Sequence, residues 1–122
     1  MLLIKNYLTA AIIAAYTIVK PGGTDFTVVP GAAAGDKVFG VTTDVDAVSG
    51  EPADVIHLGE AKVLAGAAFA AGDPLMSDAS GRAILAAAAP GANVRTVGYA
   101  RQSALAVGDI VEIVVQPGVF QG

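Results

Sequence analysis

The side chains that could carry out chemistry are few, and most of them are carboxylates. The chain has one histidine, His57, and no cysteine, so zinc–thiolate sites, disulfides and cysteine nucleophiles are excluded. A Ser-His-Asp triad could be built only around His57, and a site with several histidine ligands cannot be built at all. His57 lies in the alternating run Asp54-Val-Ile-His-Leu58, which is typical of a strand. We therefore interpret His57 as a polar or interface residue rather than a catalytic one.

An acidic stretch from Asp44 to Asp54 has the carboxylate oxygens that calcium prefers. An EF-hand loop that began at Asp44 would need an oxygen ligand and then a glycine where this chain has Val48 and Ser49. The glycine motifs of phosphate-binding loops, dinucleotide-binding folds and serine hydrolases are also absent from the sequence. We therefore interpret the stretch as a solvated loop, and we expect no enzyme activity, no metal and no cofactor.

Glycine followed by aspartate recurs at nearly equal intervals, at Gly35-Asp36, Gly72-Asp73 and Gly108-Asp109. Each pair precedes a mainly apolar run. Glycine adopts a positive φ at little cost, and an aspartate side chain can bond nearby backbone N–H groups. We predict that these six residues are structural turns that lead into strands, rather than parts of a catalytic site.

The elements that would position these residues are short β-strands. Turn signals rich in glycine, proline and aspartate recur along the chain, and runs of valine, isoleucine and threonine lie between them. These runs are Tyr16–Val19, Phe26–Val29, Lys37–Thr42, Val55–Leu58, Val94–Tyr99 and Ile110–Val115. Their spacing predicts an all-β fold, a sandwich or a barrel. The run Val38-Phe-Gly-Val41 resembles Thr96-Val-Gly-Tyr99, which suggests two related halves without establishing a duplication.

A chain of 122 residues is long enough for one domain with its own core. We place an extended, apolar N-terminal arm at residues 1–15 and a single β-barrel domain at residues 16–122. Such an arm could add a strand to the sheet edge of a neighbouring chain, where main-chain hydrogen bonds give affinity. We expect deletion of residues 1–8 to leave the barrel folded.

Charge and hydropathy restrict the partners of the chain. The formal net charge is −4, so a dense basic stripe is lacking and we expect no nucleic acid. Charged residues make up only 15% of the chain, and the mean hydropathy is +0.64. The longest apolar stretch, Leu8–Val19, is shorter than the about 20 residues of a membrane-spanning helix, and the small residues of a signal-peptide cleavage site do not follow it. We expect no membrane, and we infer that other protein chains cover much of the surface.

One segment, Ala70-Ala-Gly-Asp-Pro-Leu-Met-Ser-Asp78, is similar to the stretch that leads into a hairpin in biotinyl and lipoyl carrier domains. The hairpin tip that follows in this chain lacks the lysine that is modified in those domains. Extended to Leu85, the same segment resembles the strand-turn-strand of lambdoid head decoration proteins, and Asn93–Ala100 resembles the strand that follows there. Other similar segments are Asn6-Tyr7, Ala15–Val19, Phe39–Val41, Gly59–Val63, Gly108–Val111 and Pro117-Gly118. The chain thus resembles bacteriophage head decoration (capsid cement) proteins along nearly its whole length.

This resemblance implies a small β-barrel or β-tulip-like domain on the outer surface of the virion's capsid. It also implies a homotrimer that sits at three-fold and quasi-three-fold positions of an icosahedral head, binds the major capsid protein and clamps neighbouring subunits against internal DNA pressure. As contacts to the capsid or to a sister protomer we select Leu2, Leu3, Ile4, Tyr7 and Phe120. The alternative interpretation is a β-barrel or β-clip binding module of a secreted or tail-associated protein.

Overall fold

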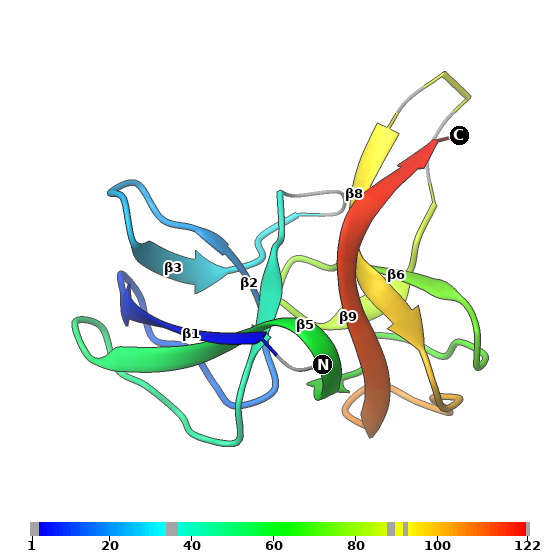
Figure 1. Ribbon diagram of the computed structural model, residues 1–122. Coiled ribbons are helices and arrows are strands. Elements are labelled where there is room, and N and C mark those ends of the chain that lie inside the picture. Colours follow the sequence, from blue (N-terminus) through cyan, green and yellow to red (C-terminus); the bar gives the residue numbers. More distant parts are fainter. Residues whose placement is uncertain (1–2, 34–36, 88–89, 92, 122) are drawn as a thin grey trace.

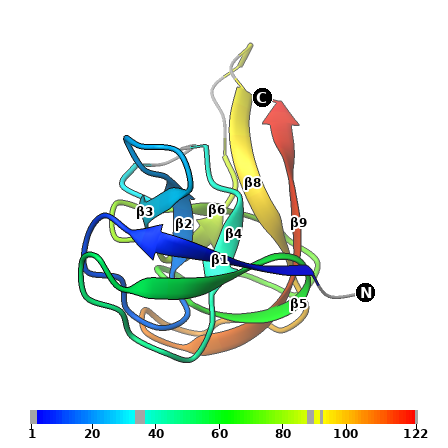
Figure 2. The same cartoon turned by 60° about the vertical axis from the view of Figure 1, so that its left-hand side comes forward.

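The computed structural model describes residues 3–33, 37–87, 90–91 and 93–121, and the regular elements among them are all β-strands. The strands are β1 (Leu3–Thr9), β2 (Ile18–Pro21), β3 (Thr27–Pro30), β4 (Gly40–Thr42), β5 (Pro52–Leu64), β6 (Pro74–Ser77), β7 (Ala83–Leu85), β8 (Asn93–Ala100) and β9 (Ile110–Gln121). The predicted all-β class is therefore confirmed. Figure 1 and Figure 2 show the strands wrapped around each other with turns at both ends.

The first five strands close into a small barrel. They follow the order β1-β3-β2-β4-β5, and β5 pairs again with β1 to complete the ring. Four of the five contacts are antiparallel, and the short ladder between β1 and β3 is parallel. Closure removes most of the open sheet edges of this half, and it confirms the predicted small barrel.

The long strand β5 belongs to two sheets. Its first part, up to Leu58, pairs with β1 and β4, and its second part, from Gly59 onward, pairs with β9. Gly59 has a φ of +111°, a value that glycine adopts more easily than other residues, at the point where the strand changes partners. The second sheet continues in the order β9-β8-β6-β7, and a parallel bridge from Ala65 to Ala83 joins β7 back to the end of β5.

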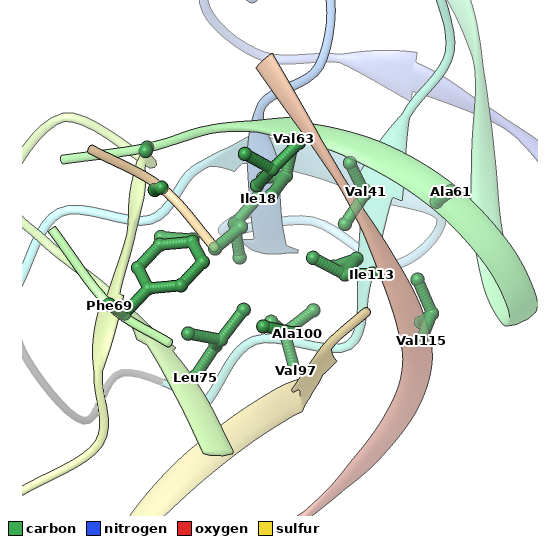
Figure 3. Packing of buried hydrophobic residues seen from close by; sticks show 14 of the residues in the cluster. Ile18, Val41, Ala61, Val63, Phe69, Leu75, Val97, Ala100, Ile113 and Val115 are labelled. Carbon is green, nitrogen blue, oxygen red and sulfur yellow. The ribbon is translucent and has the colours of Figure 1, made fainter. Parts of the chain in front are cut away.

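Two apolar cores fill these layers. The smaller core lies inside the first barrel and consists of Ile13, Val19, Val28 and Val55, with Tyr7 and Phe39 packed against it. The larger core lies between the two halves and inside the second. Figure 3 shows its labelled side chains from β2, β4, β5, β6, β8 and β9 around one interior. Burial of these branched side chains away from water is the main force that holds the strands in this arrangement.

The structure differs from the expected arm at residues 3–15. The segment Leu3–Thr9 is β1, which pairs with β5 along its length, and Ile13 is only 1% exposed in the core of the first barrel. The arm and the barrel are therefore one unit, and the boundary at residue 15 separates parts that pack together. Deletion of residues 1–8 would remove most of a barrel strand, so we now expect it to unfold this half.

The strand pairing of the second half repeats that of the first. In the first half, β1 pairs antiparallel with β5 and parallel with β3. In the second half, the second part of β5 takes the place of β1: it pairs antiparallel with β9, and the residue after it forms a parallel bridge with β7. β2 pairs with β3 and β4, and β6 pairs with β7 and β8 in the same way. β4 pairs with β5 as β8 pairs with β9. The two halves therefore have one topology, with β5 serving as the last strand of the first half and the first strand of the second.

Two glycines mark equivalent points of the repeat. A Cβ on Gly40 would lie 2.6 Å from the carbonyl oxygen of Ile56, and a Cβ on Gly98 would collide with the carbonyl oxygen of Val114. Gly40 lies on β4 beside β5, and Gly98 lies on β8 beside β9. These glycines are the ones in the two similar runs of the sequence, and both are required by close backbone approach.

Candidate interaction surface

The described part of the chain offers no cluster suited to bound-metal chemistry. No group of three His, Asp or Glu side chains within it could hold a metal ion. Nor does the described part contain a helix long and apolar enough to cross a membrane.

The strand β1 presents the first predicted contact residues at an incomplete sheet edge. Leu3 and Ile4 are each 42% exposed, although they lie in a paired strand. One edge of β1 pairs with β5, whereas the other pairs with β3 only at Leu8 and Thr9. Within the described residues, the edge from Leu3 to Tyr7 thus has no neighbouring strand. An edge of this kind can accept an extended segment of another chain.

Tyr7 lies in an aromatic cluster on the first barrel rather than free on the surface. Its hydroxyl is 2.7 Å from Nε2 of His57, and Nδ1 of His57 is 3.0 Å from the carbonyl oxygen of Phe39. Because a carbonyl oxygen can only accept, Nδ1 carries the proton and Nε2 accepts from the hydroxyl of Tyr7. The three rings lie 4.9–5.5 Å apart between centroids. Tyr7 and His57 thus tie β1 to β5 and to the residue before β4, and the partly buried ring of Tyr7 has contacts within its own chain.

Two of the three glycine–aspartate pairs lie in similar turns. Gly72 has a φ of +90° and Gly108 a φ of +92°. Asp73 accepts from the backbone N–H of Ala70 at 2.9 Å, and Asp109 accepts from those of Leu105 at 2.9 Å and Ala106 at 3.2 Å. Each carboxylate thus satisfies the backbone of its own turn just before β6 or β9 begins. Gly35 and Asp36 lie outside the described residues.

A turn of the same kind that contains glutamate precedes β5. Gly50 has a φ of +89°, and the carboxylate of Glu51 accepts from the N–H of Val48 at 2.8 Å. Ser49-Gly50 is one of the turn signals in the sequence, and here glutamate stands where the other two turns have aspartate. The acidic stretch interpreted as a solvated loop therefore contains a structural turn. Asp46 has a different role, since it accepts from the N–H of Ala15 at 2.7 Å and so links this stretch to the segment before β2.

The remaining predicted contact residues, Leu2 and Phe120, lie at the two ends of the chain. Leu2 is outside the described residues. The backbone of Phe120 belongs to β9 and is paired with Val94 of β8, and its side chain lies outside the described part. The start of β8 and the end of β9 lie past the parts of these strands that pair with β6 and β5. Among the described strands they pair only with each other, and both views show them projecting from the body. The structure therefore does not bring Phe120 together with Leu3 and Ile4 at one described contact.

Exposed apolar side chains extend well beyond the residues selected from the sequence. Those that are at least half exposed are Leu8, Ile12, Phe26, Val45, Val48, Leu105, Val107, Ile110 and Val119. Phe26 is 83% exposed and has a φ of +62°, a region where bulky residues are rare. The sequence pattern places Phe26 at the start of the run Phe26–Val29. No local signal in the sequence separates an exposed strand-end phenylalanine from a buried one.

Ion pairs lie on the outer face of the second sheet. Nη1 of Arg101 is 2.8 Å from a carboxylate oxygen of Glu60 and 3.7 Å from one of Glu112. All three side chains are at least 40% exposed, so solvent screening leaves these pairs little net stabilising effect. The second sheet therefore carries a polar outer face next to Tyr99, which is 42% exposed.

Comparison with known proteins gives a family match and similar solved structures. A family model described as phage cement protein matches residues 5–116. Among solved structures, the chain is similar to the N base of the head fiber gp8.5 of bacteriophage phi29, with a TM-score of 0.65, 23% sequence identity and coverage of 95% of each chain. At that identity the likeness concerns the fold. No curated protein sequence matches the chain.

Proposed function

Because this chain belongs to the phage cement protein family, a family of capsid-surface components of the virion, we propose that it binds the major capsid protein on the outside of an icosahedral head. It does so as a homotrimer at three-fold and quasi-three-fold positions, where it clamps neighbouring subunits and stabilises the head against internal DNA pressure. It acts by binding and not by catalysis. The observation that carries this proposal is the family match over residues 5–116.

The exposed apolar side chains support the proposal that other protein chains cover part of this surface. Leu3 and Ile4 are each 42% exposed and Phe26 is 83% exposed, in a chain with only 15% charged residues. Exposed apolar area of this kind is typical of binding surfaces, and its burial between protomers and capsid subunits would stabilise the assembly. A binding module for small ligands would instead need a pocket with aromatic walls. The surface hollows beside Asn6, beside Lys62 and beside Leu58 have no aromatic residue in their linings.

The stabilisation would follow from mass action. A protein that binds the expanded lattice and not its unexpanded form shifts the balance toward the expanded one by RT ln(1 + [L]/Kd) for each site. About 1 kcal/mol at each of many sites gives a large total for a whole head. We place the contact with the capsid at the incomplete edge of β1, with Leu3 and Ile4 as its apolar residues. The partner would add an extended segment there.

The first experiment measures the mass of the purified chain by size-exclusion chromatography with light scattering. The protein is then mixed with heads of its own phage that lack it, and the mixture is sedimented. We expect a mass of three times 12.1 kDa and co-sedimentation with the heads. A monomer that stays in the supernatant would reject the proposal and favour a binding module of a secreted or tail-associated protein.

A matched pair of variants locates the capsid contact. Leu3→Asp places a charge on the exposed part of β1, and we expect it to reduce the amount bound to heads while the protein stays folded. Leu105→Asp makes the same change at a more exposed loop position, and we expect normal binding. Equal binding by both variants would show that β1 is not the contact with the capsid.

A further inference from the structure

Phe26 combines strain with exposure at the tip of the hairpin between β2 and β3. Its φ is +62° and its side chain is 83% exposed. The tip is fixed by hydrogen bonds from the N–H of Gly22 to the carbonyl of Thr27 at 2.8 Å and from the N–H of Thr27 to that of Thr24 at 3.3 Å. Glycine would adopt this conformation with less strain. A strained, exposed aromatic residue is a reason to look for a partner that it contacts.

The equivalent position in the second half is Gly81. The parallel bridge between Thr9 and Val28 corresponds to that between Ala65 and Ala83. Counting two residues back from Val28 and from Ala83 gives Phe26 and Gly81, and both have a positive φ, of +62° and +75°. Both hairpin tips thus have a residue of positive φ at the equivalent position, a phenylalanine in the first half and a glycine in the second.

The tip that carries Gly81 packs against the first half of the same chain. The carbonyl oxygen of Gly81 accepts from the N–H of Ile18 at 2.8 Å. A Cβ on Gly81 would lie 2.6 Å from Cγ2 of Thr17 and 3.4 Å from Cβ of Pro30. Thr17, Ile18 and Pro30 therefore form the surface that receives the tip, and Ile18 is fully buried there.

The second half has an equivalent receiving surface, which is partly exposed to solvent. The N–H of Thr42 donates to the carbonyl of Thr17 at 2.9 Å, as that of Ala100 donates to the carbonyl of Asp73 at 3.0 Å. This correspondence makes Asp73 and Pro74 the counterparts of Thr17 and Ile18. Val19 pairs with Pro30 as Leu75 pairs with Leu85, so Leu85 is the counterpart of Pro30. Leu85 is 47% exposed, and Tyr99, which pairs with Pro74, is 42% exposed.

We propose that the hairpin tip bearing Phe26 packs onto Asp73, Pro74 and Leu85 of a second copy of this chain, as the Gly81 tip packs onto the first half within one chain. This interface rests on the proposed homotrimer and names the residues that would form it. Each copy would contact its two neighbours through two different surfaces, because the tip lies on the first half and the receiving surface on the second. In Figure 1 these halves lie at opposite sides of the molecule, with β3 at the left and β6 at the right. Head-to-tail contacts of this type close into a ring when the rotation between copies permits.

The contact between copies would differ from the one within the chain in two ways. Pro74 has no N–H, so the hydrogen bond that Ile18 donates to Gly81 has no counterpart. Phenylalanine replaces glycine at the tip, so an apolar side chain would supply the contact instead. Phe26 and Leu85 offer that contact from both sides, and aromatic residues in such positions often dominate the binding free energy.

Cysteine cross-linking tests the interface directly, since the chain has no native cysteine. We expect the double variant Phe26→Cys/Leu85→Cys, treated with a short bis-maleimide, to give covalent dimers and a covalent trimer on a denaturing gel. The matched control is Phe26→Cys/Leu105→Cys, whose second position is also exposed but lies outside the receiving surface, and we expect it to remain monomeric on the gel. If the Phe26→Cys/Leu85→Cys variant is itself a trimer in light scattering and stays uncross-linked, this interface is overturned and the proposed function is left intact. If the wild-type chain is a monomer in light scattering, both are overturned.

The variant Phe26→Gly separates binding from folding. Glycine relieves the positive φ, so we expect each chain to be at least as stable to urea as the wild type. We also expect the concentration at which the trimer is half dissociated to rise about thirtyfold or more, because the apolar contact is lost. An unchanged dissociation midpoint in Phe26→Gly would show that Phe26 does not lie in the interface.

Discussion

The substitution Ile13→Ala tests whether residues 10–13 are part of the barrel or part of a detachable arm. Ile13 is 1% exposed and contacts a core whose other fully buried members are Val19, Val28 and Val55. These branched side chains have few alternative rotamers, so we expect them to fill little of the cavity that alanine leaves. We estimate a loss of about 3 kcal/mol in the free energy of unfolding, within the range for buried isoleucine-to-alanine changes.

This loss converts into a melting temperature. The unfolding entropy is about 2.1 cal/mol/K per residue, or about 0.26 kcal/mol/K for 122 residues, so about 3 kcal/mol lowers Tm by roughly 12 °C. Circular dichroism at one protein concentration measures Tm, and light scattering checks that the variants have the same mass as the wild type. Ile12→Ala is the control, because Ile12 is the same residue type, adjacent in sequence and 74% exposed; we expect a change of less than about 2 °C. Equal melting temperatures for the two variants would refute the assignment of this segment to the barrel core.

Three further pairs of variants test the turns and the aromatic cluster, each by urea unfolding. Gly98→Ala should lower the free energy of unfolding by about 3 kcal/mol, because its Cβ would collide with the carbonyl of Val114. In the control Gly118→Ala, in the same hairpin, the nearest atom to the new Cβ is 3.5 Å away, and the loss should be less than about 1 kcal/mol. Similar losses for the two variants would argue against the close approach at Gly98. Gly72→Ala should lower the free energy of unfolding by about 1 kcal/mol through its φ of +90° alone, since nothing lies within 4 Å of the new Cβ. The control Gly23→Ala has equally open space and no positive φ, and it should be neutral or stabilising. An unchanged midpoint for Gly72→Ala would contradict the turn geometry. Tyr7→Phe should lower the free energy of unfolding by about 1 kcal/mol, since Nε2 of His57 loses its donor. The control Tyr99→Phe, on the exposed face, should change it by less than about 0.5 kcal/mol. An unchanged stability of Tyr7→Phe would mean that water replaces the hydroxyl.

Local chemistry made much of the fold predictable. The run Ile110–Val115 lies in β9 and the run Val94–Tyr99 lies in β8, because alternating branched residues between turn signals favour strands wherever they occur. Gly72 and Gly108 were found from the glycine–aspartate pattern, since that pattern depends only on φ and on hydrogen bonds within the turn. These features need no knowledge of distant residues.

Features that depend on distant pairing were not predictable in the same way. The predicted run Val55–Leu58 ends just before Gly59, yet β5 continues through Gly59 because β9 replaces β1 and β4 as its partner there. The sequence predicts a free arm over residues 1–15, because the residues of Leu3–Thr9 do not show that β5 pairs with them. Strand pairing over long sequence separations is set by the whole core, and one strand's composition does not specify it.

The differences between the two halves identify residues that the fold alone does not require. At equivalent positions with positive φ, the second half has Gly72 and Gly81, whereas the first half has Tyr16 and Phe26. Glycine satisfies the backbone at such positions with less strain, so the aromatic residues need another source of stabilisation. Tyr16 has one inside the chain, since its N–H donates to Thr43 at 3.1 Å and its carbonyl accepts from Leu64 at 3.0 Å, beside a partly buried side chain. The carbonyl of Phe26 also accepts within the chain, from the N–H of Leu8 at 3.3 Å, but its side chain is 83% exposed. The proposed contact with a second copy would account for an aromatic residue at this position.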